Sequence, residues 1–191
     1  MKELSVAVAN VKGGVGKTAV SASLAFSLSD RFGHDVDYRT NDSFGLKPMK
    51  RTGHKKKSKM SVVILDFGGF VPVGKQESDA EAILNEVDCL LVPVRCEALS
   101  LLAGNEILSK RESKRKTFLI GTEFTKQDCK DLKSTLGYEI LRFRRSTAVP
   151  SMLTDRRSPY EAAEEFPLLG YSYRGWLGDL ETIARKVLNG E

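Results

Sequence analysis

Residues 4–18 of this chain read LSVAVANVKGGVGKT, an apolar run followed by a glycine-rich stretch and a Lys-Thr pair. The apolar run is typical of a buried strand, and the residues after Thr18 have the spacing of a helix. Gly13, Gly14 and Gly16 would let backbone N–H groups converge on a ligand that side chains would otherwise block. Because a helix that begins here directs the positive end of its dipole to the same place, the stretch predicts a polyphosphate site.

The residue types around the glycines predict the chemistry of this site. Lys17 is expected to contact the β- and γ-phosphates, and the Thr18 hydroxyl is expected to bind a magnesium ion, Mg²⁺. The residues expected to line the bound nucleotide here are Gly13, Gly14, Val15, Gly16, Lys17, Thr18 and Ala19. The alternative is a glycine-rich turn with a lysine by chance. Seven consecutive matching residues between a strand and a helix argue against it.

The loop departs from the ordinary phosphate-binding pattern G-x-x-x-x-G-K-[ST], because the first glycine of that pattern falls on Val11. A second lysine, Lys12, stands at the mouth of the loop instead. This sequence motif, residues 12–18, resembles the deviant phosphate-binding loop of the ParA/MinD family of dimerising ATPases. The resemblance implies a P-loop NTPase fold, ATP and Mg²⁺ as cofactors, and a homodimer that forms on ATP binding. It also implies that Lys12 reaches the phosphates of the partner subunit.

The remainder of the chain alternates apolar runs with amphipathic segments. Strands are expected at residues 36–40, 61–65, 89–94, 117–120 and 138–143. Helices are expected at residues 18–32, 79–87, 97–109 and 126–136, with further helices to the end. This alternation predicts an α/β fold with a mostly parallel, twisted sheet and helices on both faces. We expect a single P-loop ATPase domain over residues 1–191.

Two aspartates near predicted strand ends are candidates for the metal site and the chemical step. Ligands of open parallel sheets lie beyond the carboxyl ends of the strands, and Asp66 follows one such run. Its place resembles that of the family's magnesium-shell carboxylate, with a helix cap as the alternative. The family's Asp-x-Asp-Pro-Gln motif falls on residues 40–44. Thr40 replaces the first aspartate, whereas Asp42 keeps the second, which orients the attacking water in relatives; the alternative is a simple turn.

The same resemblance places two further segments near the nucleotide base. Thr122 and Glu123 end an apolar run and fall where relatives line the base. Residues 144–162 are similar to the segment that follows the last strand in the family and that also borders the base.

The charge balance permits a polyanionic partner. The 191 residues include 30 Lys+Arg and 25 Asp+Glu, which gives a net charge of +5. Basic clusters lie at residues 47–59, 110–116 and 142–157, and each could be a solvated face only. If two of them shared a face of the dimer, they would bind the phosphate backbone of DNA without reading its sequence. The candidates for DNA contact are Lys55, Lys56, Lys57, Arg156 and Arg157.

The sequence also leads to predictions about the location of the protein and the state of its cysteines. There is no run of eighteen apolar residues and no leader pattern at the start, which predicts a soluble, cytoplasmic protein. Cys89, Cys96 and Cys129 are scattered, and no C-x-x-C pair occurs. We therefore expect buried thiols and neither a disulfide framework nor a zinc site.

These observations lead to a partition ATPase of the ParA type, associated with the nucleoid, as the first hypothesis. ATP would bridge two subunits, and the dimer would bind DNA without sequence preference. Slow ATP hydrolysis, catalysed by Lys12, Lys17 and Asp42, would release the dimer from DNA. The resemblance also implies a DNA-bound adaptor protein that stimulates hydrolysis.

Three alternatives remain. A MinD-like membrane-cycling ATPase would need a basic amphipathic tail. Instead, the last predicted helix mixes acidic and basic residues and has an apolar side suited to core packing, which disfavours a membrane partner. An iron–sulfur carrier ATPase would need paired cysteines, and the scattered cysteines argue against it. A nucleotide-binding scaffold with low turnover is favoured by Thr40, because that residue replaces an aspartate of the family motif.

Overall fold

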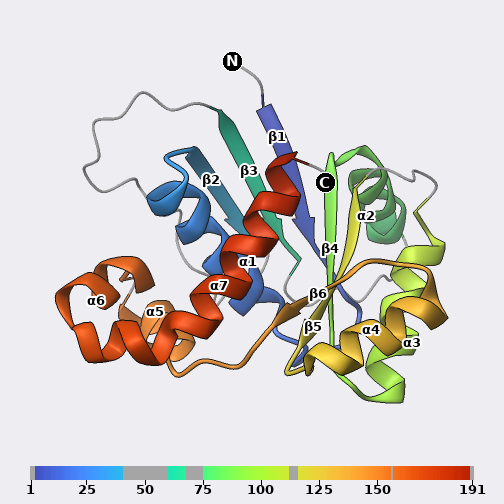
Figure 1. Ribbon diagram of the computed structural model, residues 1–191. Coiled ribbons are helices and arrows are strands. Elements are labelled where there is room, and N and C mark those ends of the chain that lie inside the picture. Colours follow the sequence, from blue (N-terminus) through green and yellow to red (C-terminus); the bar gives the residue numbers. More distant parts are fainter. Residues whose placement is uncertain (1–2, 41–59, 68–74, 112–115, 156, 190–191) are drawn as a thin grey trace.

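The computed structural model describes residues 3–40, 60–67, 75–111, 116–155 and 157–189 (Figure 1). The strands of this part are β1 (Glu3–Val8), β2 (Asp35–Thr40), β3 (Ser61–Asp66), β4 (Cys89–Val94), β5 (Thr117–Thr122) and β6 (Ile140–Phe143). The α-helices are α1 (Lys17–Phe26), α2 (Lys75–Glu86), α3 (Ala98–Ser109), α4 (Lys126–Leu136), α5 (Ala148–Asp155), α6 (Pro159–Glu165) and α7 (Pro167–Asn189). The order of strands and helices confirms the predicted α/β, P-loop NTPase fold.

The described strands form one parallel sheet in the order β2-β3-β1-β4-β5-β6. The first strand therefore lies in the middle, between β3 and β4. Val8, the last residue of β1, is level with Asp66 of β3, and Asp66 is level with Thr40 of β2. The sequence after β1 thus leaves the sheet at the same edge as Asp66, as parallel strands require.

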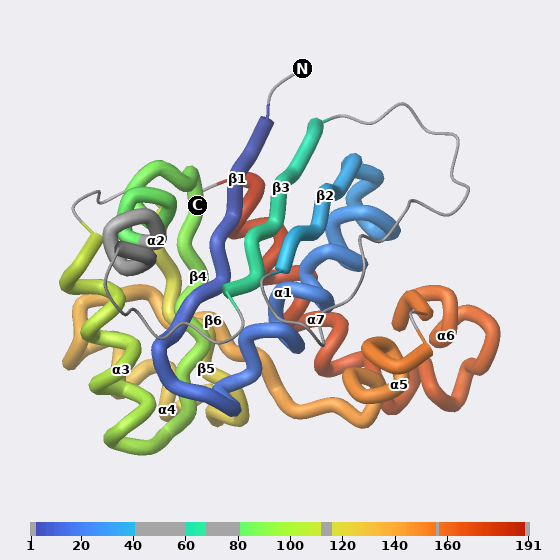
Figure 2. The backbone as a smooth tube through the Cα atoms, turned by 180° about the vertical axis from the view of Figure 1, so that it is seen from behind, coloured from blue at the N-terminus to red at the C-terminus, as the bar shows by residue number. Residues whose placement is uncertain are grey.

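Helices cover the sheet on both sides. Helices α1, α5 and α7 pack on one face, and α2, α3 and α4 pack on the other (Figures 1 and 2). The last residues of β1 and the residue that follows it alternate between the two cores, with Val6 and Val8 in one and Ala7 and Ala9 in the other. Because both faces are buried, the central strands read as continuous apolar runs.

Strand β2 differs because it lies at the edge of the described sheet. Its Asp37 is partly exposed and its Arg39 is exposed, and the two form an ion pair of 2.6 Å between Oδ2 and the guanidinium group. Tyr38, between them, points inward and is 1% exposed. An edge strand needs to bury little of its length, which explains the polar sequence of this segment.

Two expectations need correction. The first helix does not continue as an α-helix to Phe32; α1 ends at Phe26 and is followed by a π-helical turn (Ser27–Arg31), in which the Phe32 amide donates to the Ser27 carbonyl at 3.2 Å. The cysteines are not all buried. Cys89 is buried within β4 and Cys129 of α4 is half-buried, but Cys96 lies beyond the end of β4 and is exposed.

The C-terminal helix packs on the core, as its sequence pattern predicts. Its buried residues are Tyr173, Trp176, Leu180, Ile183, Ala184 and Val187. Among the described helices, none combines the length and the apolar character that crossing a bilayer would require.

Candidate nucleotide-binding site

The glycine-rich stretch forms the loop between β1 and α1. Gly14 and Gly16 have φ angles of 73° and 92°, in the region that residues with a β-carbon rarely adopt. Gly16 is also the N-cap of α1, and no described side chain caps that end. The first turn of α1 is therefore suited to an anion, which would receive its N–H groups and the positive end of its dipole.

One side chain of this loop and one of β5 tie the loop to the neighbouring strands. Asn10 donates from Nδ2 to the Pro93 carbonyl at 2.8 Å, and its Oδ1 accepts from the Lys12 amide at 2.8 Å. Thr122 Oγ1 lies 3.1 Å from the Val15 carbonyl and 3.0 Å from the Val94 carbonyl, so its single proton can serve either. The Thr122 hydroxyl thus braces the loop, while the residue also lines the adjoining cavity.

The two lysines of the loop occupy different environments. Lys17 is 6% exposed, and its Nζ donates to the Lys12 carbonyl at 2.9 Å, inside the loop. Lys12 points to the mouth of the loop, where its Nζ lies 3.0 Å from Glu97 Oε1 and about a third of the side chain is exposed. One ammonium group is therefore enclosed by its own loop and the other is held at the surface.

Asp66 lies beside this loop and is 2% exposed. Its Oδ2 accepts a 2.7 Å hydrogen bond from the Tyr38 hydroxyl, whereas Oδ1 is buried without a hydrogen-bond partner among the described residues. Burial raises the pKa of the Asp66 carboxyl, and the hydrogen bond from Tyr38, the nearby hydroxyls of Thr18 and Ser21 and the charge of Lys17 oppose that shift.

The residues present fit a magnesium ion. Thr18 and Asp66 offer hard oxygen ligands next to each other, and the orphaned Oδ1 of Asp66 is an atom that a cation would satisfy. Magnesium in nucleotide sites takes one or two protein oxygens and completes its shell with phosphates and waters. Thr18 and Asp66 would hold it here, and the ion would supply positive charge to the phosphates.

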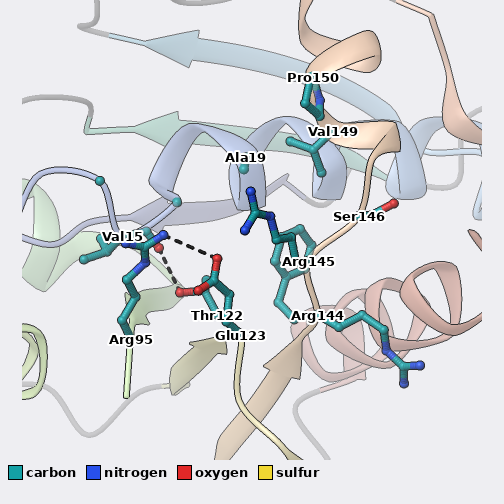
Figure 3. A pocket seen from close by; sticks show the side chains of 13 residues that line it. Val15, Ala19, Arg95, Thr122, Glu123, Arg144, Arg145, Ser146, Val149 and Pro150 are labelled. Carbon is teal, nitrogen blue, oxygen red and sulfur yellow. Dashed lines mark hydrogen bonds and ion pairs between the residues drawn. The ribbon is translucent and has the colours of Figure 1, made fainter. Parts of the chain in front are cut away.

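A cavity of about 190 Å³ adjoins the loop (Figure 3). Its walls come from the loop, the start of α1, the ends of β4 and β5, and the segment between β6 and α5. Glu123 has a φ of 70°, and its amide donates to the Phe143 carbonyl at 3.2 Å. A non-glycine residue in this region indicates a backbone held by its surroundings, as is common at binding sites.

Two arginines at this cavity were not singled out from the sequence. Arg95 lies at the mouth, where its guanidinium is 3.4 Å from Glu123 Oε1, and Arg145 extends toward the cavity (Figure 3). Arg144 instead points away, to Asp179 of α7 at 2.7 Å (Figure 3). Arg95 directly follows the carboxyl end of β4, so the strand-end rule applied to Asp66 would have found it.

The proposed catalytic Asp42 and the DNA candidates Lys55, Lys56, Lys57 and Arg156 lie outside the described residues. Arg157 is described: it forms an ion pair with Glu165, and its guanidinium lies 5.6 Å from the ring centre of Phe166. Arg142 and Arg144 of the same basic cluster both bind Asp179, at 3.1 and 2.7 Å. A sequence count of positive charges therefore overstates what this cluster offers to a polyanion.

Comparisons with known proteins agree with this geometry. The sequence matches the family described as the CobQ/CobB/MinD/ParA nucleotide binding domain over residues 6–165. It is 29% identical over 133 residues to maintenance of carboxysome distribution protein A of Halothiobacillus neapolitanus, an alignment that covers 61% of this chain and 62% of that protein. The chain thus spans about three fifths of the length of that curated relative.

Two solved structures are similar over nearly the whole chain. Apo McdA of Cyanothece superposes with a TM-score of 0.68 at 13% identity, covering 98% of this chain and all of the other. The MinD cell division protein of Aquifex aeolicus superposes with a TM-score of 0.64 at 18% identity, covering 98% and 97%. At such identities the likeness shows the fold alone. The family match spans most of the sequence and includes the phosphate loop, so this chain belongs to the CobQ/CobB/MinD/ParA family of nucleotide-binding domains.

Proposed function

We propose that this protein is an ATP-dependent positioning ATPase of the ParA type, which forms a nucleotide-sandwich homodimer, binds DNA without sequence preference and hydrolyses ATP slowly. The observation that carries the proposal is the placement of the two loop lysines. Lys17 is enclosed within its own phosphate loop, and Lys12 stands at the mouth beside Glu97. An ammonium group at the mouth is suited to phosphates that a second subunit presents.

The proposed catalysis consists of positioning and charge stabilisation. Lys17 and Lys12 would neutralise the charge that develops on the transferred phosphoryl group, and Asp42 would orient the attacking water. The cavity beside Thr122 and Glu123 would receive the base. Thr40 lies level with Asp66 and replaces an aspartate of the family motif, which favours the alternative of a nucleotide-binding scaffold with little turnover. An ATP-bound dimer that releases no phosphate would support that alternative.

Lys12→Ala is expected to weaken the ATP-bound dimer more than it weakens nucleotide binding by the monomer. A charged hydrogen bond to a partner's phosphate contributes about 1.5–3 kcal/mol, so the dimer dissociation constant should rise by on the order of 10- to 100-fold. Light scattering after size exclusion with a non-hydrolysable ATP analogue measures the dimer, and a fluorescent ATP analogue at low protein concentration measures the monomer.

The matched control for this variant is Glu97→Gln, which removes the ion pair with Lys12 and leaves the Lys12 side chain in place. Because both partners are partly exposed, their ion pair contributes about 1 kcal/mol at most, and dimerisation should change by less than about fivefold. Equal losses of nucleotide affinity and dimer formation in Lys12→Ala would contradict the role across subunits.

Duplex DNA is expected to bind only the ATP state, with an affinity that falls steeply between about 50 and 200 mM salt. Each phosphate contact should add about −0.9 to the slope of log affinity against log salt. Changing Lys55, Lys56 and Lys57 together to Glu should flatten this slope and leave the ATPase rate without DNA near the parent value. Arg157→Glu should act less, because that residue is already paired with Glu165.

The matched control for the DNA variants uses Lys126, Lys130 and Lys133, three exposed lysines of α4, changed together to Glu. This triple change alters the net charge by the same amount as the change of Lys55, Lys56 and Lys57. A slope that falls equally in both triple variants would show an effect of net charge alone. A flat salt response in the parent, or equal binding without nucleotide, would reject DNA as the partner.

Two kinds of cargo fit the proposed function. The relative from Halothiobacillus is named for carboxysome distribution, which supports a protein assembly as cargo as readily as a replicon. Both cargoes are compatible with ATP-dependent DNA binding and a DNA-bound or cargo-bound adaptor that stimulates hydrolysis. Binding of the ATP state to anionic vesicles instead of DNA would favour the membrane-cycling alternative, which the buried apolar side of α7 does not support.

A further inference from the structure

We propose that Tyr38 is a positioning residue for the magnesium site, whose hydroxyl fixes one oxygen of the Asp66 carboxylate and leaves the other for the metal ion. This inference rests on the proposed nucleotide function and deepens it. Tyr38 does not touch nucleotide or metal in this assignment. It acts through Asp66.

The geometry links three elements around one hydroxyl group. Tyr38 Oη of β2 lies 2.7 Å from Asp66 Oδ2 of β3 and 3.3 Å from Ser21 Oγ of α1. Ser21 Oγ in turn lies 3.2 Å from the carbonyl oxygen of Thr18. A phenol has one proton, and the carboxylate is the stronger acceptor, so that proton belongs to Asp66.

The two oxygens of Asp66 have the environments expected of a metal ligand that is oriented by a hydrogen bond to one of its oxygens. Oδ2 is used by Tyr38, and Oδ1 is buried without a hydrogen-bond partner among the described residues. A purely structural carboxylate at 2% exposure would be expected to have both oxygens satisfied. Thr18, the other proposed ligand, is close enough to Asp66 for its hydroxyl to lower the pKa of the Asp66 carboxyl.

The position of Tyr38 in its strand supports a dedicated role. Tyr38 is the one fully buried residue of β2, which is an edge strand. If burial were the only requirement at this position, an aliphatic side chain would satisfy it. Two residues later, Thr40 is level with Asp66 and stands where the family motif has an aspartate. At the strand position level with Asp66, the described part of the chain therefore has no carboxylate, and Tyr38 provides a neutral hydrogen-bond donor to Asp66.

The test removes only the hydroxyl, in Tyr38→Phe, and measures metal binding directly. The probe is Mn²⁺, titrated by electron paramagnetic resonance into the full chain saturated with a non-hydrolysable ATP analogue. Loss of a group that orients a metal ligand typically weakens metal affinity by about 10- to 100-fold, and we expect a loss at the lower end of that range. Affinity for the ATP analogue in EDTA should stay at the parent value.

Tyr160→Phe is the matched control. It removes the hydroxyl of a partly buried tyrosine, which donates to Ser27 Oγ at 3.0 Å, beyond the end of α1 that faces away from the loop. Its Mn²⁺ affinity should equal that of the parent. Ser21→Ala, which removes the other contact of the Tyr38 hydroxyl but keeps its bond to Asp66, should lose less Mn²⁺ affinity than Tyr38→Phe.

The outcomes separate this inference from the proposed function. A parent-like Mn²⁺ affinity in Tyr38→Phe overturns the role of Tyr38 and leaves the proposed function intact. Equal losses in Tyr38→Phe and Tyr160→Phe, or an equal loss of nucleotide affinity in EDTA, overturn it in favour of simple packing. If the parent shows no Mn²⁺ binding that depends on nucleotide, the proposed function fails together with the inference.

Discussion

Lys17→Ala is expected to abolish ATP binding and every behaviour that depends on it. The Lys17 ammonium is enclosed by the phosphate loop at 6% exposure, so its interactions with phosphates would be only weakly screened by water. Two charged hydrogen bonds to phosphate oxygens together would contribute about 3–6 kcal/mol, and affinity should fall by at least on the order of 10²-fold. Titration with a fluorescent ATP analogue measures the loss.

Lys130→Ala is the control, because it removes an equal charge from the exposed side of α4. It should bind ATP like the parent. Lys17→Gln keeps most of the length and the polarity of the side chain and should behave like Lys17→Ala, since the positive charge is what the phosphates need. ATP-dependent dimer formation by either Lys17 variant would contradict the assignment of this loop as the nucleotide site.

Asp42→Ala is expected to bind ATP and remain a trapped dimer while turnover falls by on the order of 10²-fold or more. A carboxylate that positions water acts on the chemical step and leaves binding in the ground state unchanged. Phosphate release measures the turnover, and light scattering with ATP measures the dimer. The assignment comes from the alignment of residues 40–44 with the family motif, because Asp42 lies outside the described residues.

Asp37→Ala provides a matched carboxylate change in the same region. Asp37 is in β2, is partly exposed and pairs with Arg39, so its removal should leave hydrolysis near the parent rate. If Asp42→Ala hydrolyses ATP like the parent, the alignment across this polar strand is wrong and another residue positions the water.

The arrangement of the phosphate loop could be read from residues 4–18 because its causes are local. Glycines that adopt positive φ, an apolar strand before them and a helix after them lie within fifteen consecutive residues. The two-sided burial of the central strands was visible for a similar reason, since each strand carries its own apolar pattern. The exposed Cys96 was missed although Arg95 and Glu97 flank it in the sequence, because burial was expected to continue past the end of the apolar run that precedes it.

The contacts that shape the site depended on the tertiary structure. Thr122 braces the loop across 107 residues of sequence, and Tyr38 reaches Asp66 across 28. Arg144 pairs with Asp179 over 35 residues, which removes it from the surface charge that the composition suggests. Periodicity and motif spacing determined the strands, the helices and the phosphate loop. Only the order of strands in the sheet decided which side chains meet at its carboxyl edge, because hydrogen bonds and ion pairs depend on distance in space and not on separation along the chain.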